Sequence, residues 1–165
     1  MAHTHVFEIG YKAGMTDPIG RGLKHDIAHL GLAKVKQVAS AQLYKMSGTL
    51  SASDRSRIAD DLLCDPILNE CHPSPSPLPR ERASKARGEG KSSMVIDVWY
   101  KAGVTDVAGD SVRKGIEDLG IHDVKDVRTG MRYHLQGLTK RETAEKIALA
   151  LVVNPLVHDF TVHAD

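Results

Sequence analysis

The feature that most constrains this chain is an internal duplication. The segment Tyr11–Gly20, YKAGMTDPIG, recurs as Tyr100–Gly109, YKAGVTDVAG, with seven of ten positions identical. The same offset of 89 residues relates Leu30-Gly31 to Leu119-Gly120. Self-similarity at a fixed offset indicates repeated structural units. The sequence therefore predicts two homologous copies, each of about 70 residues, which is a small but sufficient length for one core.

The copies are expected over residues 4–71 and 94–165, with residues 72–93 as a linker. Prolines alternate with other residues over 73–79, and arginine, lysine and glycine then dominate. Proline restricts the backbone and removes a donor, and this stretch shows no apolar periodicity. These properties favour a solvated tether. The alternative is a docking segment for a proline-recognising or acidic partner.

Composition narrows the class of protein. Hydrophobic residues make up 41% of the chain and aromatic residues only 4%, so an aliphatic core is expected. The net charge of +1 gives no electrostatic reason to expect nucleic acid or an anionic membrane as partner. No apolar run is long enough for a transmembrane helix, and the first residues do not resemble a secretory signal. A cytoplasmic protein with Cys64 and Cys71 as reduced thiols is expected.

Each copy is predicted to open with a strand and a helix. Phe7 and Ile9 alternate with polar residues, a period typical of a half-buried strand. Asp17 stands before a proline, where an aspartate caps a helix N-terminus. Gly31 and Gly120 stand where a left-handed residue ends a helix. An amphipathic helix packed on a sheet is therefore expected in both copies.

The rest of the copy is predicted from its second occurrence. Val124–Leu135 is interpreted as a hairpin that turns at Gly130. Thr139–Glu142 has the spacing of a capping box and predicts a second helix, and Val157–His163 alternates as a last strand. In the first copy Pro73 falls within that last strand, which is expected to be shortened or lost. The predicted fold is α+β: two β-α-β-β-α-β repeats with antiparallel sheets, packed as a pseudo-two-fold pair.

No group of residues in the sequence has the pattern of a catalytic site. The loops around Gly20 and Gly109 lack both a GxGxxG pattern and a Walker lysine, which favours close helix–sheet approach over phosphate binding. Asp17 and Asp106 are interpreted as helix caps rather than acids. A small enzyme is therefore the least favoured function.

Two further sets of residues leave alternatives open. Lys12 and Lys101 follow the first strand of each copy, where they are either ordinary strand ends or contacts to a phosphate or a partner's carboxylate. His25 and His29 are spaced as a metal pair on one helix face. The second copy has other residue types at their positions, so a solvated face is favoured.

These motifs, taken together, resemble the PurS family of phosphoribosylformylglycinamidine synthase. The resemblance covers both copies, and its motifs are a basic strand end, a helix opening, a Leu-Gly helix end, a Val-x-x-Val strand and an Asn-Pro closing segment. They are Lys12, Gly14, Thr16–Gly20, Leu30-Gly31, Val35 and Val38, then Lys101, Gly103, Thr105–Gly109, Leu119-Gly120, Val124, Val127 and Asn154–Asp159. Val107 replaces the family's proline, and the usual Gly-Lys after the second strand is Gly130-Met131-Arg132 here and Ala41-Gln42 in the first copy.

The resemblance implies a function that the residues alone do not show. PurS is a small subunit that dimerises and joins a synthetase subunit to a glutaminase subunit, and the complex is a glutamine-dependent carbon–nitrogen ligase that uses ATP and magnesium. This chain is then expected to bind no cofactor or metal, to associate with those two subunits and with itself, and to act as a covalent version of the dimer. The candidates for structural loops or partner contacts are Lys12, Asp17, Gly20, Lys101, Asp106, Gly109, Gly130 and Arg132.

A ligand-binding regulatory module is the second hypothesis. It depends on the strand–helix–strand–strand–helix–strand order, which is shared with ferredoxin-like regulatory domains. Fold analogy of this kind is weak evidence for function.

Overall fold

The computed structural model describes residues 3–74 and 93–165. Both copies follow one order, strand–helix–strand–helix–strand. The first contains β1 (His3–Tyr11), α1 (Pro18–His29), β2 (Gln37–Gly48), α2 (Ala52–Ile58), the π-helical turn η1 (Ala59–Leu63) and β3 (Asn69–Ser74). The second contains β4 (Ser93–Tyr100), α4 (Val107–Asp118), β5 (Val124–Gln136), α5 (Arg141–Ile147), the π-helical turn η2 (Ala148–Val152) and β6 (His158–Ala164). Most of the linker expected over residues 72–93, namely 75–92, lies outside the described residues, whereas its two ends belong to strands: 72–74 to β3 and Ser93 to β4.

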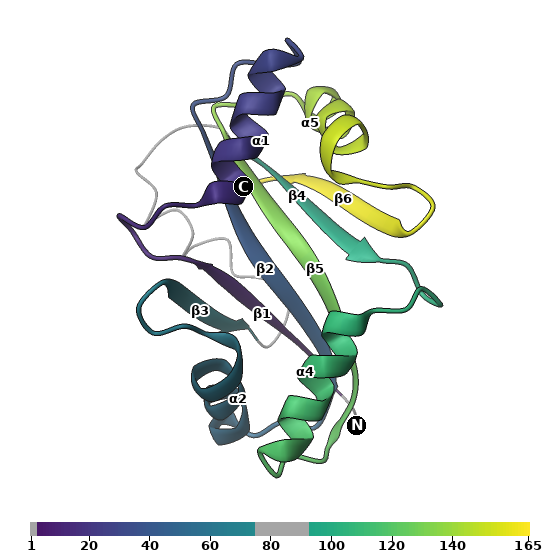
Figure 1. The fold of residues 1–165 in the computed structure, drawn as a ribbon. Helices are drawn as coiled ribbons and strands as arrows, with labels where there is room; N and C mark the ends of the chain where they lie inside the picture. Colours follow the sequence, from purple (N-terminus) through teal and green to yellow (C-terminus); the bar gives the residue numbers. More distant parts are fainter. Residues whose placement is uncertain (1–2, 75–92) are drawn as a thin grey trace. The chain divides into compact units, whose positions relative to one another are not determined.

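The chain forms two compact units, and each unit contains elements of both copies. Among the described residues, the first unit comprises 3–15, 41–74 and 102–130, and the second comprises 16–40, 93–101 and 131–165. Helix α4 of the second copy therefore belongs with β1, α2 and β3 of the first copy (Figure 1). Helix α1 of the first copy belongs with β4, α5 and β6 of the second copy. The long strands β2 and β5 contribute residues to both units.

The strands pair in antiparallel fashion within each unit. Strand β1 lies between β2 and β3 and is antiparallel to both, and β4 is antiparallel to β6. Hydrogen-bonded neighbours follow β3-β1-β2-β5 in the first unit and β2-β5-β4-β6 in the second. Strands β3 and β6 are thus the edges of their units.

Each unit has its own aliphatic core, as the composition predicted. In the first unit, Phe7 and Ile9 of the first copy pack with Ile116 and Val127 of the second. The second unit's buried residues are Leu23, Ile27, Val38, Met94, Ile96, Val98, Tyr133, Leu135, Leu138, Ala144, Ile147, Ala148, Val153 and Val162. Because both cores combine residues from both copies, neither copy completes a core by itself.

The predicted hairpin over Val124–Leu135 is wrong, because β5 is one continuous strand of 13 residues. Gly130 does not have the positive φ that a tight primed turn needs, although five other glycines among the described residues do. Its carbonyl instead accepts a hydrogen bond from Gln42 Nε2 at 3.2 Å. The β-α-β-β-α-β order on which the ferredoxin-like alternative depended is therefore not found.

The first copy keeps its last strand, contrary to the expectation that Pro73 would shorten or abolish it. Strand β3 pairs with β1 from Tyr11↔Asn69 to Val6↔Ser74, and Phe7 lies opposite Pro73. Lys12 N donates to Leu68 O at 2.9 Å, so these two residues form a hydrogen-bonded pair. Hydrogen-bonded and non-hydrogen-bonded pairs alternate along an antiparallel ladder, and this pair shows which residues of β3 bond to β1. By that alternation Pro73 occupies a pair without hydrogen bonds, so its missing N–H removes no bond to β1.

The first helix of each copy starts and ends as predicted. Asp17 and Asp106 are N-caps, and their carboxylates accept from Gly20 N and Gly109 N, both at 2.8 Å. Gly120 follows α4 with φ +81°. The capping box predicted at Thr139–Glu142 is wrong, because α5 has Lys140 at its N-cap and no side-chain cap.

The first copy has the capping box that the second lacks. Ser51 and Asp54 hold each other's backbone N–H groups at the start of α2. Across residues 3–74 and 93–165, no helix is long and apolar enough to span a membrane.

Candidate functional site

The two aspartates predicted as caps each make a second connection, to the strand that follows the helix. Asp17 Oδ2 accepts from Ser40 N at 2.5 Å, and its Oδ1 accepts from Ser40 Oγ at 2.8 Å. Asp106 repeats the arrangement with Thr129, whose N donates at 2.6 Å and whose Oγ1 donates at 2.9 Å. Each carboxylate thereby fixes the helix start to a long strand. Its hydrogen-bonding capacity is used within the fold.

Gly20 and Gly109 allow this connection because a side chain has no room at either position. A Cβ on Gly20 would lie 2.5 Å from Val38 O, and one on Gly109 would lie 2.4 Å from Val127 O. Contacts that close do not occur between real atoms, so only glycine lets the first turn of the helix approach the strand backbone. The geometry supports close helix–sheet approach as the role of these glycines.

A tyrosine from the opposite copy lies near each aspartate: Tyr133, which is buried, near Asp17, and Tyr44, which is half-buried, near Asp106. Burial raises the pKa of Tyr133, and the negative charge of Asp17 raises it further. Burial and then the charges of Cys71 and Asp106 raise the pKa of Tyr44 in the same direction. In both cases burial and a nearby negative charge favour the neutral phenol over the phenolate. These tyrosines, like Ser40 and Thr129, occupy matching positions in the two copies, and aligning the copies was the signal that would have identified them.

The two candidate lysines mark equivalent strand ends. The backbone N–H groups of Lys12 and Lys101 donate to Leu68 O and Val157 O, each at 2.9 Å. Lys12 Nζ also donates to the carbonyl of Pro66. Each lysine therefore lies beside the loop that leads into the last strand of its copy.

Arg132 is the most buried of the basic candidates, and its partner was not anticipated. Its Nε and Nη2 donate to Asp97 Oδ1 at 2.6 Å and Oδ2 at 2.7 Å, with the arginine 9% and the aspartate 7% exposed. His163 Nε2 lies 3.3 Å from the same Asp97 Oδ2. A carboxylate within the apolar strand MVIDVWY was the available sequence signal. At the matching positions the first copy has Glu8 and Leu43, so this cluster exists in one copy only.

Other histidines and the two thiols have contacts of their own. His134 Nδ1 lies 3.7 Å from Asp165 Oδ2. The rings of His25 and His29 stack with centroids 6.0 Å apart on the exposed face of α1. Cys64 and Cys71 are both free thiols, and burial followed by the charge of Cys64 raises the pKa of Cys71 to about 12. Among the described residues no three His, Cys, Asp or Glu side chains gather to hold a metal ion.

The placement of the eight candidate residues follows from these contacts. Asp17 with Gly20, and Asp106 with Gly109, form matching helix-start connections in the two units. Lys12 and Lys101 lie at the ends of the first strands, and their backbone N–H groups donate to the loop that precedes the last strand of each copy. Gly130 and Arg132 are close neighbours on β5, but the Gly130 carbonyl bonds to Gln42 whereas the Arg132 guanidinium bonds to Asp97. The candidates therefore form several separate contacts.

Comparison with known proteins identifies the repeated unit. The family model described as PurS, phosphoribosylformylglycinamidine (FGAM) synthase, matches residues 4–74 and again residues 93–165. Among solved structures the chain is similar to Methanocaldococcus jannaschii PurS, one of the subunits of formylglycinamide ribonucleotide amidotransferase in the purine biosynthetic pathway. That likeness has 22% identity and a TM-score of 0.37, and it covers 45% of this chain and 95% of that one. No curated protein matches. The two family matches together span most of the sequence, so the chain belongs to the PurS family, subunits of FGAM synthase in purine biosynthesis, and carries the family's domain twice.

Proposed function

We propose that this chain is a non-catalytic subunit that joins the synthetase and glutaminase subunits of FGAM synthase. The observation that carries the proposal is the family match over both copies. The internal use of the candidate polar groups supports it, because Asp17, Asp106 and Arg132 are all bound within the fold. On this proposal the chain itself binds no ATP, magnesium or glutamine, and it acts in the cytoplasm with its partners.

The surface that meets these partners includes one turn from each copy. Asp65 Oδ1 accepts from Ile67 N at 2.8 Å, and Asn154 Oδ1 accepts from Leu156 N at 3.1 Å. Both turns present a large apolar side chain to solvent, with Ile67 72% and Leu156 84% exposed. Anchored apolar side chains of this kind are suited to the pockets of a protein partner.

The duplication gives this surface a further property. Ile67 and Leu156 are equivalent residues, and Lys12 and Lys101 are the equivalent lysines beside their turns. One chain therefore offers the same type of contact twice. A single-copy relative would need two chains to do so.

The proposal is tested by reconstitution with the separately purified synthetase and glutaminase. A joining subunit is required for the glutamine-dependent reaction, because ammonia must pass from one partner to the other. It is not required when free ammonia is supplied to the synthetase. Equal glutamine-dependent turnover with and without this chain would overturn the proposal, and so would catalytic turnover by the chain alone.

The partner surface is tested in the same assay. Ile67→Ser and Leu156→Ser should each weaken capture of a partner by the tagged chain, and the double variant should weaken it most. Val107→Ser is the matched control, because Val107 is 71% exposed but lies at the start of a helix rather than in either turn. Thermal melting should be unchanged in all these variants, since exposed side chains contribute little to stability. Unchanged capture by the double variant would exclude the turns as the contact surface.

A further inference from the structure

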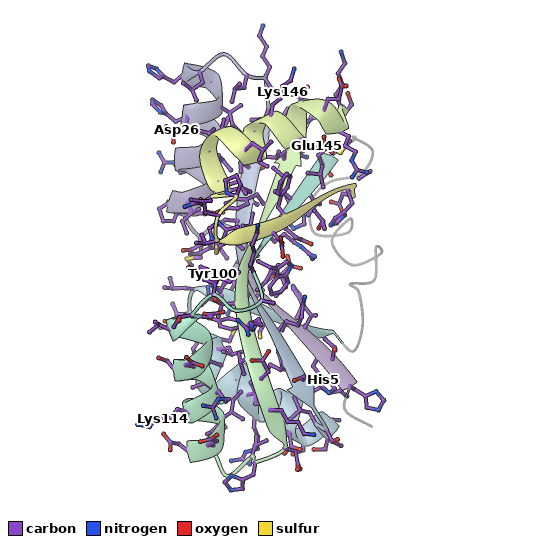
Figure 2. The ribbon with its side chains drawn as sticks, turned by 90° about the vertical axis from the view of Figure 1, so that its right-hand side faces the viewer. His5, Asp26, Tyr100, Lys114, Glu145 and Lys146 are labelled. Atoms are coloured by element: carbon purple, nitrogen blue, oxygen red, sulfur yellow. The ribbon has the colours of Figure 1, made fainter. Side chains whose placement is uncertain are left out.

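The two edge strands differ in how they can accept another strand. Within the second unit, β6 pairs with β4 from Met94↔Ala164 to Tyr100↔His158. Among the described residues no strand pairs with the other side of β6. Figure 2, which views the protein from the right-hand side of Figure 1, shows β6 in front of the other strands of its unit. An unpaired edge of this kind is a template for a further strand.

The hydrogen bonds at the two ends of this ladder show which groups face outward. Asp165 N donates to Ser93 O at 3.0 Å, and Lys101 N donates to Val157 O at 2.9 Å. In an antiparallel pair, hydrogen-bonded residues alternate with residues that make no bond across that ladder. Asp159, Thr161 and His163 therefore bond to β4. The N–H and C=O groups of the intervening Phe160, Val162 and Ala164 point away from β4, toward the open edge.

The outer edge of β3 is protected against strand addition by a proline at the matching position. Pro73 occupies the position in the first copy that Val162 occupies in the second. It lies in a pair without hydrogen bonds to β1, so its nitrogen points to the outer edge of β3 and offers no N–H there. Proline at an edge is a common protection against strand addition. Strand β6 has no proline and no lysine along HDFTVHA, so only the second copy keeps an open edge.

We propose that β6 pairs, edge to edge and antiparallel, with β6 of a second copy of this chain. The sequence of β6 is complementary to itself about Thr161. In that register Phe160 lies opposite Val162 of the second copy, which places two apolar side chains side by side. Asp159 lies opposite His163 of the second copy, which places a carboxylate beside an imidazole. Cross-strand pairs of both kinds stabilise antiparallel sheets.

A second copy fits this edge better than an unrelated strand because every pair occurs twice. A two-fold axis through Thr161 makes the contact isologous and closed, so it produces a dimer and not a fibre. Thr161 and His163 are exposed on the strand, and His163 also contacts Asp97 within its own chain. A seven-residue strand forms a small interface, so the dimer should be reversible. This inference does not depend on the proposed joining function.

The test compares the full chain with two matched variants by sedimentation from micromolar to millimolar concentration. Thr161→Lys places two like charges opposite each other at the two-fold axis and should keep the chain monomeric. His72→Lys changes the equivalent exposed residue of β3 and should associate as the unmodified chain does. Thr161→Val, which offers a β-branched apolar pair at the axis, should associate more strongly and excludes a general loss of folding.

Amide hydrogen exchange locates the contact. Association through β6 should slow the exchange of Phe160, Val162 and Ala164 N–H groups at high concentration, while exchange along β3 does not change. The proposal is overturned if the chain stays monomeric at millimolar concentration with these amides exchanging freely, which would leave the edge to another protein's strand. It is also overturned if Thr161→Lys associates as strongly as the unmodified chain, or if protection appears at other residues.

Discussion

Arg132 and Asp97 form a bidentate ion pair that is almost fully removed from solvent, through contacts of 2.6 and 2.7 Å between β5 and β4. A buried pair of this kind contributes little beyond what apolar residues would contribute, but breaking it leaves an uncompensated charge. Because the first copy has Leu43 in place of this arginine, the second unit depends on a pair for which the first copy has no equivalent.

Arg132→Leu alone should lower the free energy of unfolding by about 3–5 kcal/mol, because Asp97 then remains buried and charged. Adding Asp97→Val should recover most of that loss. Urea unfolding of the two single variants and the double variant measures the coupling. Additive losses in the double variant would contradict the assignment of this pair as a coupled unit.

Gly20→Ala and Gly109→Ala should each destabilise the protein by about 1–3 kcal/mol, because the new methyl group would overlap a strand carbonyl. Gly22 is the matched control, since it lies in the same helix as Gly20 and a Cβ there meets nothing within 4 Å. Gly22→Ala should stabilise the helix by up to about 1 kcal/mol. Thermal or urea unfolding that ranks the three variants otherwise would contradict the close-approach role.

Gly120→Val should lower the free energy of unfolding by about 1 kcal/mol or more, because Gly120 has φ +81° at the end of α4. A Cβ added at Gly120 would meet no neighbouring atom within 4 Å, so the cost arises from the backbone alone. Gly120→Asn should cost less, since asparagine tolerates this conformation better. Equilibrium unfolding that does not distinguish valine from asparagine would argue against the cap.

His5 should make the protein sensitive to acid. It is buried in β1, and desolvation lowers its pKa from the ordinary 6.5, with the charge of Arg55 acting in the same direction and the backbone of Gly48 opposing. The folded state therefore favours the neutral ring, and this contribution is complete above the ordinary pKa. It is lost as pH falls through 6.5 toward the lower folded-state value.

The measurement is the free energy of unfolding as a function of pH for the unmodified chain and for His5→Met. Methionine is the residue that the second copy has at the matching position, Met94. The variant should show a smaller loss of stability between neutral and mildly acidic pH. An identical pH slope in both proteins would show that His5 is not the responsible group.

Cleavage of the chain between the copies should not separate them. A protease site introduced within residues 75–92 divides the chain, yet each unit takes core residues from both fragments, such as Ile27 and Leu135 in the second unit. The two fragments should therefore elute together in size-exclusion chromatography under native conditions and separate in denaturant. Native separation into two folded fragments would contradict the mixed units.

Local signals in the sequence determined a large part of this protein. The duplication, the aspartate caps at Asp17 and Asp106, and the left-handed glycines at Gly31 and Gly120 were all readable. A cap or a positive φ depends on a few adjacent residues, so its signal is complete within a short segment. The duplication also carried the family assignment, since the same motifs occur twice in the same order.

Tertiary structure alone decided which copy's elements pack together. The apolar stripes of α1 and α4 are alike, so either helix fits either set of strands by pattern. Only packing places Ile27 of the first copy with Leu135 of the second. Long-range pairing also explains why β5 continues as one strand past Gly130 instead of turning there. It likewise places Arg132 beside Asp97, which is 35 residues away in sequence. These choices depend on contacts between distant segments, which no local pattern encodes.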